Sequence, residues 1–530
     1  MTQFDVLVVG YGPAGATLAN LLGQRGYRVA VIEQAAAIYD KPRAITADHE
    51  AMRVFQACGL ADDIARSTVP HPGTDFVGVE GQTIKRFYPQ PPPHPLAWEP
   101  TWMFVQPELE ATLRKGVERF DQVHVFLEHE FISLSQTDAS AQVKIRRLED
   151  GEILEFQARY VVACDGARSP VREQLSAAID DLAFDEYWIV VDAWLRGDVQ
   201  LPPRCVQYCR PSRPGTYIVG PGQLRRWEIK MLPGESPAEF SDEQAIRRVL
   251  SEFVVTDALE LCRHAVYRFH ALVVHEWRFG RVFLMGDAAH QMPPFLGQGL
   301  CAAIRDAVNL VWKMDAVERL GASPQLLDTY GEERKPHVRT IVRHAKSFGL
   351  IIGELDEAAA RERDAQLMDE MAAGKAETVR QKFIPGLQGG LIDMDATSKP
   401  ALGAGTLFVQ PWVQMGSGPF CRLDDLLPPG FLLVSASVEP LQWLDAESAE
   451  KWQRLQGQQV VVLSEPPLTS STVPALLVTE RDGVFRKWLE ELGAVVVLVR
   501  PDGYVYGIAK NAAELKRLVH ALYQALFTSL

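Results

Sequence analysis

The sequence predicts an α/β protein built on a parallel, Rossmann-like sheet, with an inserted antiparallel layer and a small α/β domain at the carboxyl end. Three observations predict this. A short apolar strand runs into the glycine-rich turn Gly10–Gly15 and then into a helix. A second apolar strand, ending at Gly286-Asp287, returns to the sheet after a long stretch of strand-like alternation. A break rich in Gly and Pro follows at Pro385–Gly405, as is typical of a domain boundary.

Composition and charge narrow the classes of protein to consider. The 530 residues are too many for one ordinary core, so two or three domains are expected. A net charge of −14 argues against general binding to nucleic acid or to an anionic membrane. The uncharged run Val6–Gln24 lacks the basic start of a signal peptide, so we expect a cytoplasmic protein. The seven cysteines include no CxxC pair and no zinc-like spacing, which predicts reduced thiols and no metal site.

The amino-terminal segment predicts a βαβ unit of the size that binds a dinucleotide. Phe4–Val9 is short, apolar and β-branched, like a buried parallel strand, and Ala14–Gln24 has a helical pattern. The second strand, Arg28–Ile32, ends at Glu33. A carboxylate at that place accepts hydrogen bonds from a ribose diol and disfavours a 2′-phosphate.

Each glycine of the first turn has a separate expected role. Gly10 permits the turn, Gly12 lets the backbone approach a pyrophosphate, and Gly15 allows the helix to pack closely on the strand. Pro13 and Ala14 then open the helix, whose N-terminal N–H groups favour phosphate. The turn therefore predicts a bound dinucleotide.

Two later turns extend this predicted site. Tyr160–Cys164 is typical of a buried strand and runs into Asp165-Gly166, with Arg172 shortly after. Arg281–Met285 returns to the parallel sheet and runs into Gly286-Asp287, where a carboxylate is placed to accept from a sugar hydroxyl. The two turns are expected at the same edge of the sheet as the first.

A long helix is predicted over Gly299–Val317. Its first N–H groups, near Gly299 and Leu300, would favour negative charge on a ligand ring. Pro293 and Pro294 are expected to hold the preceding segment stiff beside that ring, and Pro294 and Gly297 are candidates for ligand contact. Helical patterns also occur over residues 47–58, 107–120 and 325–375, and two smaller candidates for ligand contact are Arg43 and Gln106.

The rest of the chain divides by pattern. Residues 181–280 are strand-like and rich in Arg and aromatic side chains, as in an inserted antiparallel layer. Beyond the break, strands at 432–434, 460–463 and 495–500 alternate with helical stretches. The predicted domains are residues 1–180 and 281–400 for the nucleotide-binding domain and its helical linker, 181–280 for the substrate layer, and 401–530 for the last domain.

The ordered set of turns resembles the class A flavoprotein monooxygenases, which are FAD-dependent aromatic hydroxylases. Four further strings are similar to the bacterial 3-(3-hydroxyphenyl)propanoate hydroxylase branch of that family: Trp188–Asp192, Met231–Glu235, Leu327–Arg334 and Phe408–Pro411. The chain departs from many relatives at Phe295-Leu296, which follows the paired prolines.

The resemblance implies a fold, a cofactor and a reaction. It implies an FAD-binding sheet of the glutathione-reductase type and a thioredoxin-like carboxyl-terminal domain, which we expect to serve packing or homodimerisation because it has no CxxC. It implies FAD as cofactor, NADH or NADPH and O2 as cosubstrates, and a small phenolic acid as substrate. The implied reaction is hydroxylation ortho to the phenol through a flavin C4a-hydroperoxide.

This chemistry needs a proton acceptor for the phenol and a cation for the carboxylate. The candidate acceptors in the inserted layer are Tyr217, Tyr267 and His270, with His270 first because its strand leads directly to Gly286-Asp287. Pro294 is expected beside the reacting ring. The candidate carboxylate ligands are Arg204, Arg210 and Arg225.

Other functions remain open from the residues. One is hydroxylation of another phenolic or heteroaromatic ring, and one is a flavin reductase of the same fold. A halogenase is disfavoured because its Trp-x-Trp-x-Ile-Pro string does not occur. A protein that holds FAD structurally, with the last domain as a binding module, is a third class.

Overall fold

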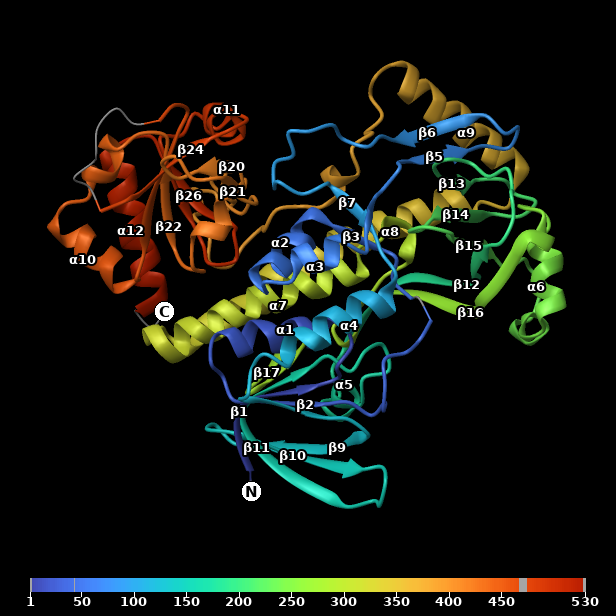
Figure 1. Ribbon diagram of the computed structural model, residues 1–530, viewed down its shortest axis with the longest axis horizontal. Helices are drawn as coiled ribbons and strands as arrows, with labels where there is room; N and C mark the ends of the chain where they lie inside the picture. Colours follow the sequence, from blue (N-terminus) through green and yellow to red (C-terminus); the bar gives the residue numbers. More distant parts are fainter. Residues whose placement is uncertain (1, 42, 467–473, 528–530) are drawn as a thin grey trace.

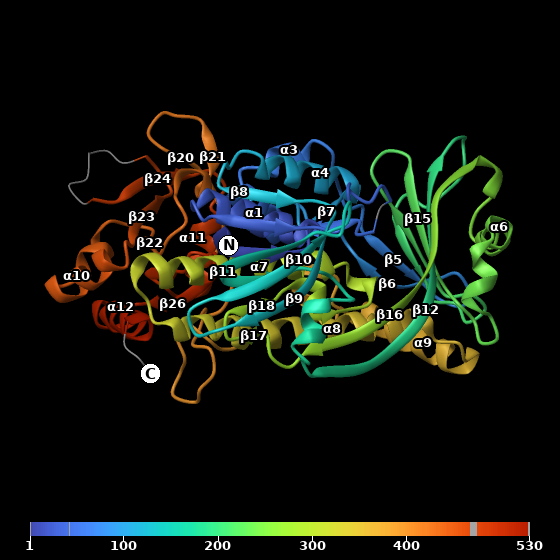
Figure 2. The ribbon, with the colours of Figure 1, turned by 90° about the horizontal axis from the view of Figure 1, so that it is seen from below.

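The computed structural model describes residues 2–41, 43–466 and 474–527, and their strands form four sheets. Figure 1 shows three regions in a row: an antiparallel layer (green), a central parallel sheet with its helices, and a carboxyl-terminal domain (orange to red). Figure 2 shows the first and last of these at opposite ends of the molecule. The predicted α/β class is confirmed.

The central sheet has a parallel core that brings the predicted turns together. β1 (Thr2–Val9) pairs in parallel with β2 (Val29–Ile32) and β11 (Ile153–Ala163), and β11 pairs in parallel with β18 (Val282–Leu284). The carboxyl ends of parallel strands meet at one edge, so the turns after β1, β11 and β18 are neighbours. The other strands of this sheet are β8 (Val123–Phe126), β9 (His129–Gln136), β10 (Ala141–Arg147) and β17 (Arg278–Phe279).

Helices cover the central sheet. α1 (Pro13–Gln24) packs against α4 (Gln106–Val117) and α7 (Gly299–Asp315), as Figure 1 shows. α7 continues as a π-helical turn and ends at Gly321, whose φ is +71°. The helix predicted over residues 47–58 is shorter, α2 (His49–Ala57), because Asp48 caps it by accepting from the Ala51 N–H at 2.9 Å.

Short elements complete this region. The small sheet before and after α2 consists of β3 (Thr46–Asp48), β4 (Val69–Pro70) and β7 (Thr101–Met103). Two short helices are α3 (Ala61–Ala65) and α5 (Pro170–Gln174). The helical pattern over 325–375 is confirmed by α8 (Thr329–Gly353) and α9 (Glu357–Ala372).

The antiparallel layer is larger than the segment predicted for it. Its strand order is β19 (His290–Gln291), β16 (Leu259–Val274), β12 (Ile179–Leu195), β15 (Leu224–Lys230), β14 (Gly215–Val219), β13 (Cys205–Tyr208), β5 (Thr74–Val77) and β6 (Thr83–Phe87). β5 and β6 come from far upstream of residues 181–280. One face of the sheet packs on α6 (Glu243–Leu250), and the opposite face turns toward the interior.

The carboxyl-terminal domain contains a seven-stranded sheet. Its order is β21 (Phe420–Arg422), β20 (Trp412–Gln414), β24 (Leu476–Glu480), β23 (Gln458–Leu463), β22 (Leu432–Ser435), β25 (Val496–Val499) and β26 (Val505–Ala509). The parallel pair β22–β23 beside the antiparallel pair β25–β26, with α10 (Ala446–Arg454), α11 (Val484–Glu491) and α12 (Ala512–Phe527), has the thioredoxin-like arrangement. The predicted thioredoxin-like domain is therefore confirmed.

A buried ionic cluster joins this domain to the central helices. Glu333 of α8 lies 2.8 Å from Lys313 and 2.7 Å from Arg500, and Arg500 also pairs with Asp502 at 2.6 Å. All four side chains are buried. The thioredoxin-like domain is thus fixed to the helices of the central sheet by paired charges. None of the helices in the described ranges combines the length and apolar run that a bilayer crossing requires.

Candidate active site

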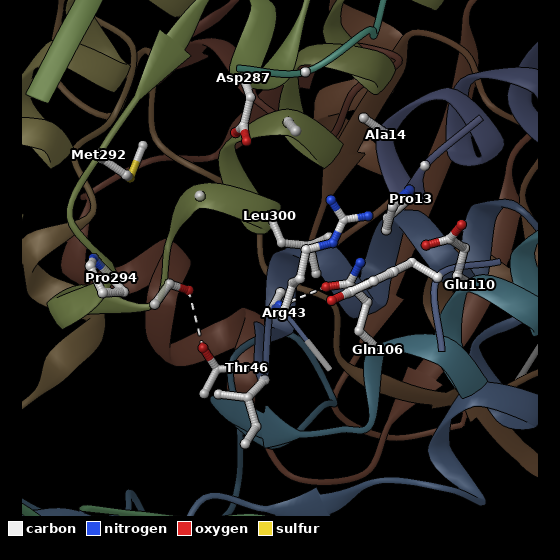
Figure 3. Close-up of a pocket in the computed structure, with 18 of the residues that line it drawn as sticks. Pro13, Ala14, Arg43, Thr46, Gln106, Glu110, Asp287, Met292, Pro294 and Leu300 are labelled. Carbon is white, nitrogen blue, oxygen red and sulfur yellow. Dashed lines mark hydrogen bonds between the residues drawn. The ribbon is translucent and has the colours of Figure 1, made fainter. Parts of the chain in front are cut away.

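A cavity of about 850 Å³ lies between the strand-end turns of the central sheet and the inner face of the antiparallel layer. Figure 3 shows Asp287, Ala14, Pro13, Arg43 and Leu300 around one part of it, with Met292, Pro294 and Thr46 around another. The structure brings most of the predicted cofactor residues to this cavity: Gly10, Gly12, Pro13, Ala14, Glu33, Arg43, Gln106, Asp165, Asp287, Pro294, Gly297, Gly299 and Leu300.

The first turn leaves space where a ligand would approach. Gly10 has φ +99°, and a Cβ there would lie 2.3 Å from the Cys164 carbonyl oxygen. A Cβ on Gly15, which does not line the cavity, would lie 2.0 Å from the Gly10 carbonyl oxygen. A Cβ on Gly12 would meet nothing within 4 Å. Gly10 and Gly15 therefore serve chain packing, whereas Gly12 keeps the cavity open beside a helix N-terminus without a side-chain cap.

Backbone contacts hold the predicted polar groups at this end. The Glu33 carboxylate accepts from the Tyr11 N–H at 2.9 Å and the Ala35 N–H at 2.8 Å. The Gln106 side-chain oxygen accepts from the Ala44 N–H at 2.6 Å, which fixes the segment that carries Arg43. The Arg43 side chain extends into the cavity in Figure 3.

The second turn is tied to the third. Asp165 accepts from the Val171 N–H at 3.2 Å, and burial raises the pKa of its carboxyl. Arg172 does not line the cavity. It donates to the carbonyls of Ala167 at 2.7 Å and Ala288 at 3.1 Å, and so joins the two turns. Gly286 also lies behind the cavity, where a Cβ would be 3.1 Å from Ala303 of α7.

The third turn presents a carboxylate to the cavity. Figure 3 shows the Asp287 oxygens directed inward, and enclosure by the protein raises the pKa of this group. Within the described ranges its carboxylate has no hydrogen-bond partner. α7 begins at Gly299 without a side-chain cap, so the first N–H groups of the helix face the same space. Behind the turn, His290 lies 2.8 Å from Asp306 and is buried.

Side-chain alternation decides which residues of β14 and β16 face the cavity. Tyr267 and Phe269 line it, whereas His270 points to the other face, half-buried and 3.6 Å from Asp185. Thr216 lines the cavity, whereas Tyr217 packs against Trp227 at 5.4 Å on the α6 side. Burial raises the pKa of Tyr217 to about 12. The structure therefore does not bring His270 or Tyr217 to the predicted reaction site.

The three arginines predicted to bind a carboxylate also lie outside the cavity lining. Arg204 lies 3.6 Å from Asp75, and Arg210 donates to the carbonyls of Arg213 and Glu252. Arg225 donates to the Leu224 carbonyl at 2.7 Å. Each has partners elsewhere on the chain.

Among the polar residues that line the cavity and that sequence reasoning missed are His71, Arg226, Glu228, Arg263 and Arg380. Arg226 and Arg263 lie 2.7 and 3.3 Å from the buried Asp192. Burial raises the pKa of Glu228 to about 7. The alternation of Arg226 and Glu228 with apolar residues along β15 was the available signal, whereas nothing local marks His71 or Arg380.

These features fit FAD. Two uncapped helix N-termini and the open space at Gly12 suit a pyrophosphate and an electron-rich ring edge. Glu33 at the end of β2 and the inward carboxylate of Asp287 suit sugar and ribityl hydroxyls.

Comparison with known protein families supports this assignment. Residues 3–345 match the family described as FAD binding domain, and residues 405–525 match the HcaD C-terminal domain. A 3-(3-hydroxy-phenyl)propionate/3-hydroxycinnamic acid hydroxylase of Comamonas testosteroni is 31% identical, with 98% of each chain covered. The protein of the same name from Mycolicibacterium gilvum is 33% identical, over 97% of this chain and 91% of the relative. A probable NADH-specific resorcinol 4-hydroxylase of Rhodococcus jostii is 34% identical, over 98% and 95%.

Solved structures share the fold across the whole chain. The flavin-dependent monooxygenase PieE, in complex with FAD and substrate, has a TM-score of 0.80 at 23% identity, with 99% of each chain covered. Aklavinone-11 hydroxylase, in a ternary complex with FAD and aklavinone, has a TM-score of 0.76 at 22% identity, with the same coverage.

Proposed function

From its place in the FAD-binding family of flavoprotein aromatic hydroxylases, to which this chain belongs, we infer that it hydroxylates a phenolic acid such as 3-(3-hydroxyphenyl)propanoate. The reaction would consume one O2 and one NADH with a proton, insert one oxygen atom into the ring, and release water and NAD⁺. The observation that carries this proposal is a single cavity that joins the FAD-type turns to an aromatic-lined sheet face.

The names of the relatives support the substrate class. Two relatives that cover nearly the whole chain are named for 3-(3-hydroxyphenyl)propionate, and another for resorcinol, which is also a phenol. The cavity wall includes Phe76, Phe87, Phe269 and Phe295, which suit an aromatic ring. The name of the resorcinol relative also supports NADH over NADPH.

The chain's own residues would hold the cofactor at one end of the cavity. Gly12 and the N-terminus of α1 would receive the pyrophosphate with Arg43, Glu33 would accept from the ribose, and Asp287 from the ribityl chain. Bound FAD would supply the two-electron chemistry between NADH and O2. Pro294, Gly297 and the N-terminus of α7 would border its ring, and the apolar wall would exclude water.

We propose that Glu228 accepts the phenol proton. Its carboxyl lines the cavity, and a pKa raised to about 7 matches a general base at neutral pH. Tyr267, which also lines the cavity, contacts Arg263 and is the alternative acceptor. Hydroxylation ortho to the phenol, a flavin hydroperoxide route and homodimerisation stay predictions.

The test is NADH and NADPH oxidation by the purified flavoprotein with a panel of phenols headed by 3-(3-hydroxyphenyl)propanoate and resorcinol, with mass detection of products. Stimulated oxidation and a product heavier by one oxygen atom are expected. Stimulated oxidation that yields hydrogen peroxide but no hydroxylated product would mean that the true substrate is another ring. No stimulation by any phenol would contradict the proposal and favour a reductase or a structural FAD protein.

A further inference from the structure

Arg380 brings a positive charge to the cavity without a carboxylate to balance it. It begins a short turn after α9, Arg380–Phe383, and lines the cavity beside Thr46 and Gly297. Its Nη2 donates to the Leu296 carbonyl at 2.6 Å. Within the part of the chain that the structure describes, no carboxylate lies within ion-pair distance of its guanidinium. Burial lowers its pKa, which reflects the cost of this enclosed charge.

His71 places a second donor beside this arginine. Its Nδ1 accepts from the Gly73 N–H at 2.9 Å, and burial lowers the pKa of the ring to about 3. A neutral ring that accepts at Nδ1 carries its proton on Nε2. That Nε2 lies 3.3 Å from Arg380 Nη1. In the tautomer that accepts from Gly73, Nε2 and Nη1 are both donors, and their separation lets one acceptor receive from both.

Among residues 2–41, 43–466 and 474–527, we find no free charged acceptor there. Asp48, the carboxylate that influences Arg380, already pairs with Arg305. The neighbouring thiol of Cys205 is neutral, because burial raises its pKa to about 11. A ligand in the cavity is therefore the source of a charged acceptor that this place favours.

An apolar wall adjoins the two donors. Phe76 of β5 and Phe87 of β6 line the same cavity, with ring centroids 5.5 Å apart. Phe87 also contacts Phe383, which closes the turn that Arg380 begins. An anionic group and an aromatic ring can thus be bound side by side.

We propose that Arg380 and His71 form an oxyanion-binding subsite that holds an ionised oxygen of the aromatic substrate, either its carboxylate or its phenolate. The assignment rests on the proposed function. The two residues would then determine substrate preference. They take the role predicted for Arg204, Arg210 and Arg225, whose side chains have other partners outside the cavity lining.

The test compares Arg380→Met and His71→Phe with the wild-type holoenzyme. The ligands are 3-(3-hydroxyphenyl)propanoate, its methyl ester, resorcinol and 3-phenylpropanoate, and binding is measured by flavin absorbance and by calorimetry. Loss of a charge-assisted bond should weaken binding of the acid about 10- to 100-fold in Arg380→Met and about 3- to 10-fold in His71→Phe. Arg361→Met, at an exposed arginine of α9, is the matched control and should bind as wild type.

The ligand panel separates the two sources of the anion. If the carboxylate is bound, both acids weaken in Arg380→Met while the ester and resorcinol change less than about threefold. If the phenolate is bound, the phenols weaken together, 3-phenylpropanoate is unaffected, and the absorbance of bound phenolate is lost. Wild-type affinity of both variants for all four ligands would overturn the subsite.

Failure of the proposed function has a different signature. In that case the wild-type enzyme oxidises NADH no faster with any phenol, whereas the effect of Arg380→Met on the binding of 3-phenylpropanoate and of resorcinol still reports on the subsite. The conservative Arg380→Lys variant, which keeps the charge, should recover part of the lost affinity and excludes misfolding as the cause.

Discussion

The molecule contains two groups of charged side chains that differ in how they are balanced: one is buried and one faces the cavity. At the contact between α8 and the carboxyl-terminal domain, Glu333 lies within 2.8 Å of both Lys313 and Arg500. In the cavity, Arg380 and Asp287 have no oppositely charged side chain within ion-pair distance among the described residues. The first group is paired within the protein, whereas the second faces the cavity in which we expect the cofactor and the substrate.

This difference separates structural from functional charge. A buried charge that loses its partner costs several kcal/mol, so Lys313, Glu333 and Arg500 depend on one another. Arg380, by contrast, is only half-buried, and Asp287 is exposed to the cavity. The paired group fixes the thioredoxin-like domain to the central helices. The unbalanced group marks where the cofactor and the substrate are expected. Four changes would break or sharpen this contrast.

The largest expected effect is on the paired group. Glu333→Gln leaves Lys313 and Arg500 buried without their shared anion and should lower the free energy of unfolding by about 3–5 kcal/mol. Urea unfolding of the holoenzyme measures this. Glu80→Gln breaks the exposed pair with Arg361 and should leave the free energy of unfolding nearly unchanged. Equal small losses in both variants would show that the buried pairing contributes little.

The next effect is on Glu228, whose folded-state pKa is raised from 4.5 to about 7. Between these values the folded protein holds a proton that the unfolded chain has released, so stability falls as pH rises through this window. Glu228→Gln removes the group and should gain about 2–3 kcal/mol relative to wild type between about pH 5 and pH 8. Urea unfolding of wild type and variant at about pH 5 and at about pH 8 measures this gain. The Glu149→Gln variant, at an exposed position, is the control. A gain that does not change with pH would contradict the raised pKa.

A smaller effect is expected at Asp287, whose carboxylate faces the cavity. Asp287→Ala removes a charge-assisted acceptor and should raise the Kd for FAD about 10- to 100-fold. Fluorescence titration of the apoprotein with FAD measures it, and Asp121→Ala, on the surface, is the control. Full flavin occupancy after purification of Asp287→Ala would place the ribityl contact elsewhere.

The smallest effect is expected at His270, which lies on the face of β16 opposite Tyr267. Replacement by Phe should change the rates of flavin reduction and hydroxylation by no more than about twofold, because the side chain does not reach the cavity. Stopped-flow kinetics measure both rates. A tenfold loss of hydroxylation with normal reduction would restore His270 as the proton acceptor.

The parts that the sequence predicts well are those set by local chemistry. The strand-end turns follow from backbone demands that only glycine meets, such as the approach of Gly10 to the Cys164 carbonyl. The parallel sheet, the long helix after Gly299 and the thioredoxin-like strands follow from apolar periodicity. These elements carry most of the expected cofactor contacts.

The parts it predicts poorly depend on which face a strand presents and on distant segments. His270 and Phe269 are neighbours in sequence but point to opposite sides of β16, and a choice by residue type alone cannot separate them. β5 and β6 join the antiparallel layer from far upstream. Arg380 reaches the cavity only because the chain returns after α9, which no local pattern announces.

Arg380 also lies outside both matched family regions, which cover residues 3–345 and 405–525. The connecting segment that carries it contributes to the substrate end of the cavity, whereas the residues expected to hold FAD belong to the first region. The subsite that we propose therefore combines His71 of the first matched region with Arg380 of the connecting segment. Grafting residues 346–404 from a related hydroxylase would change the Arg380 side of that subsite and leave the residues expected to hold FAD in place.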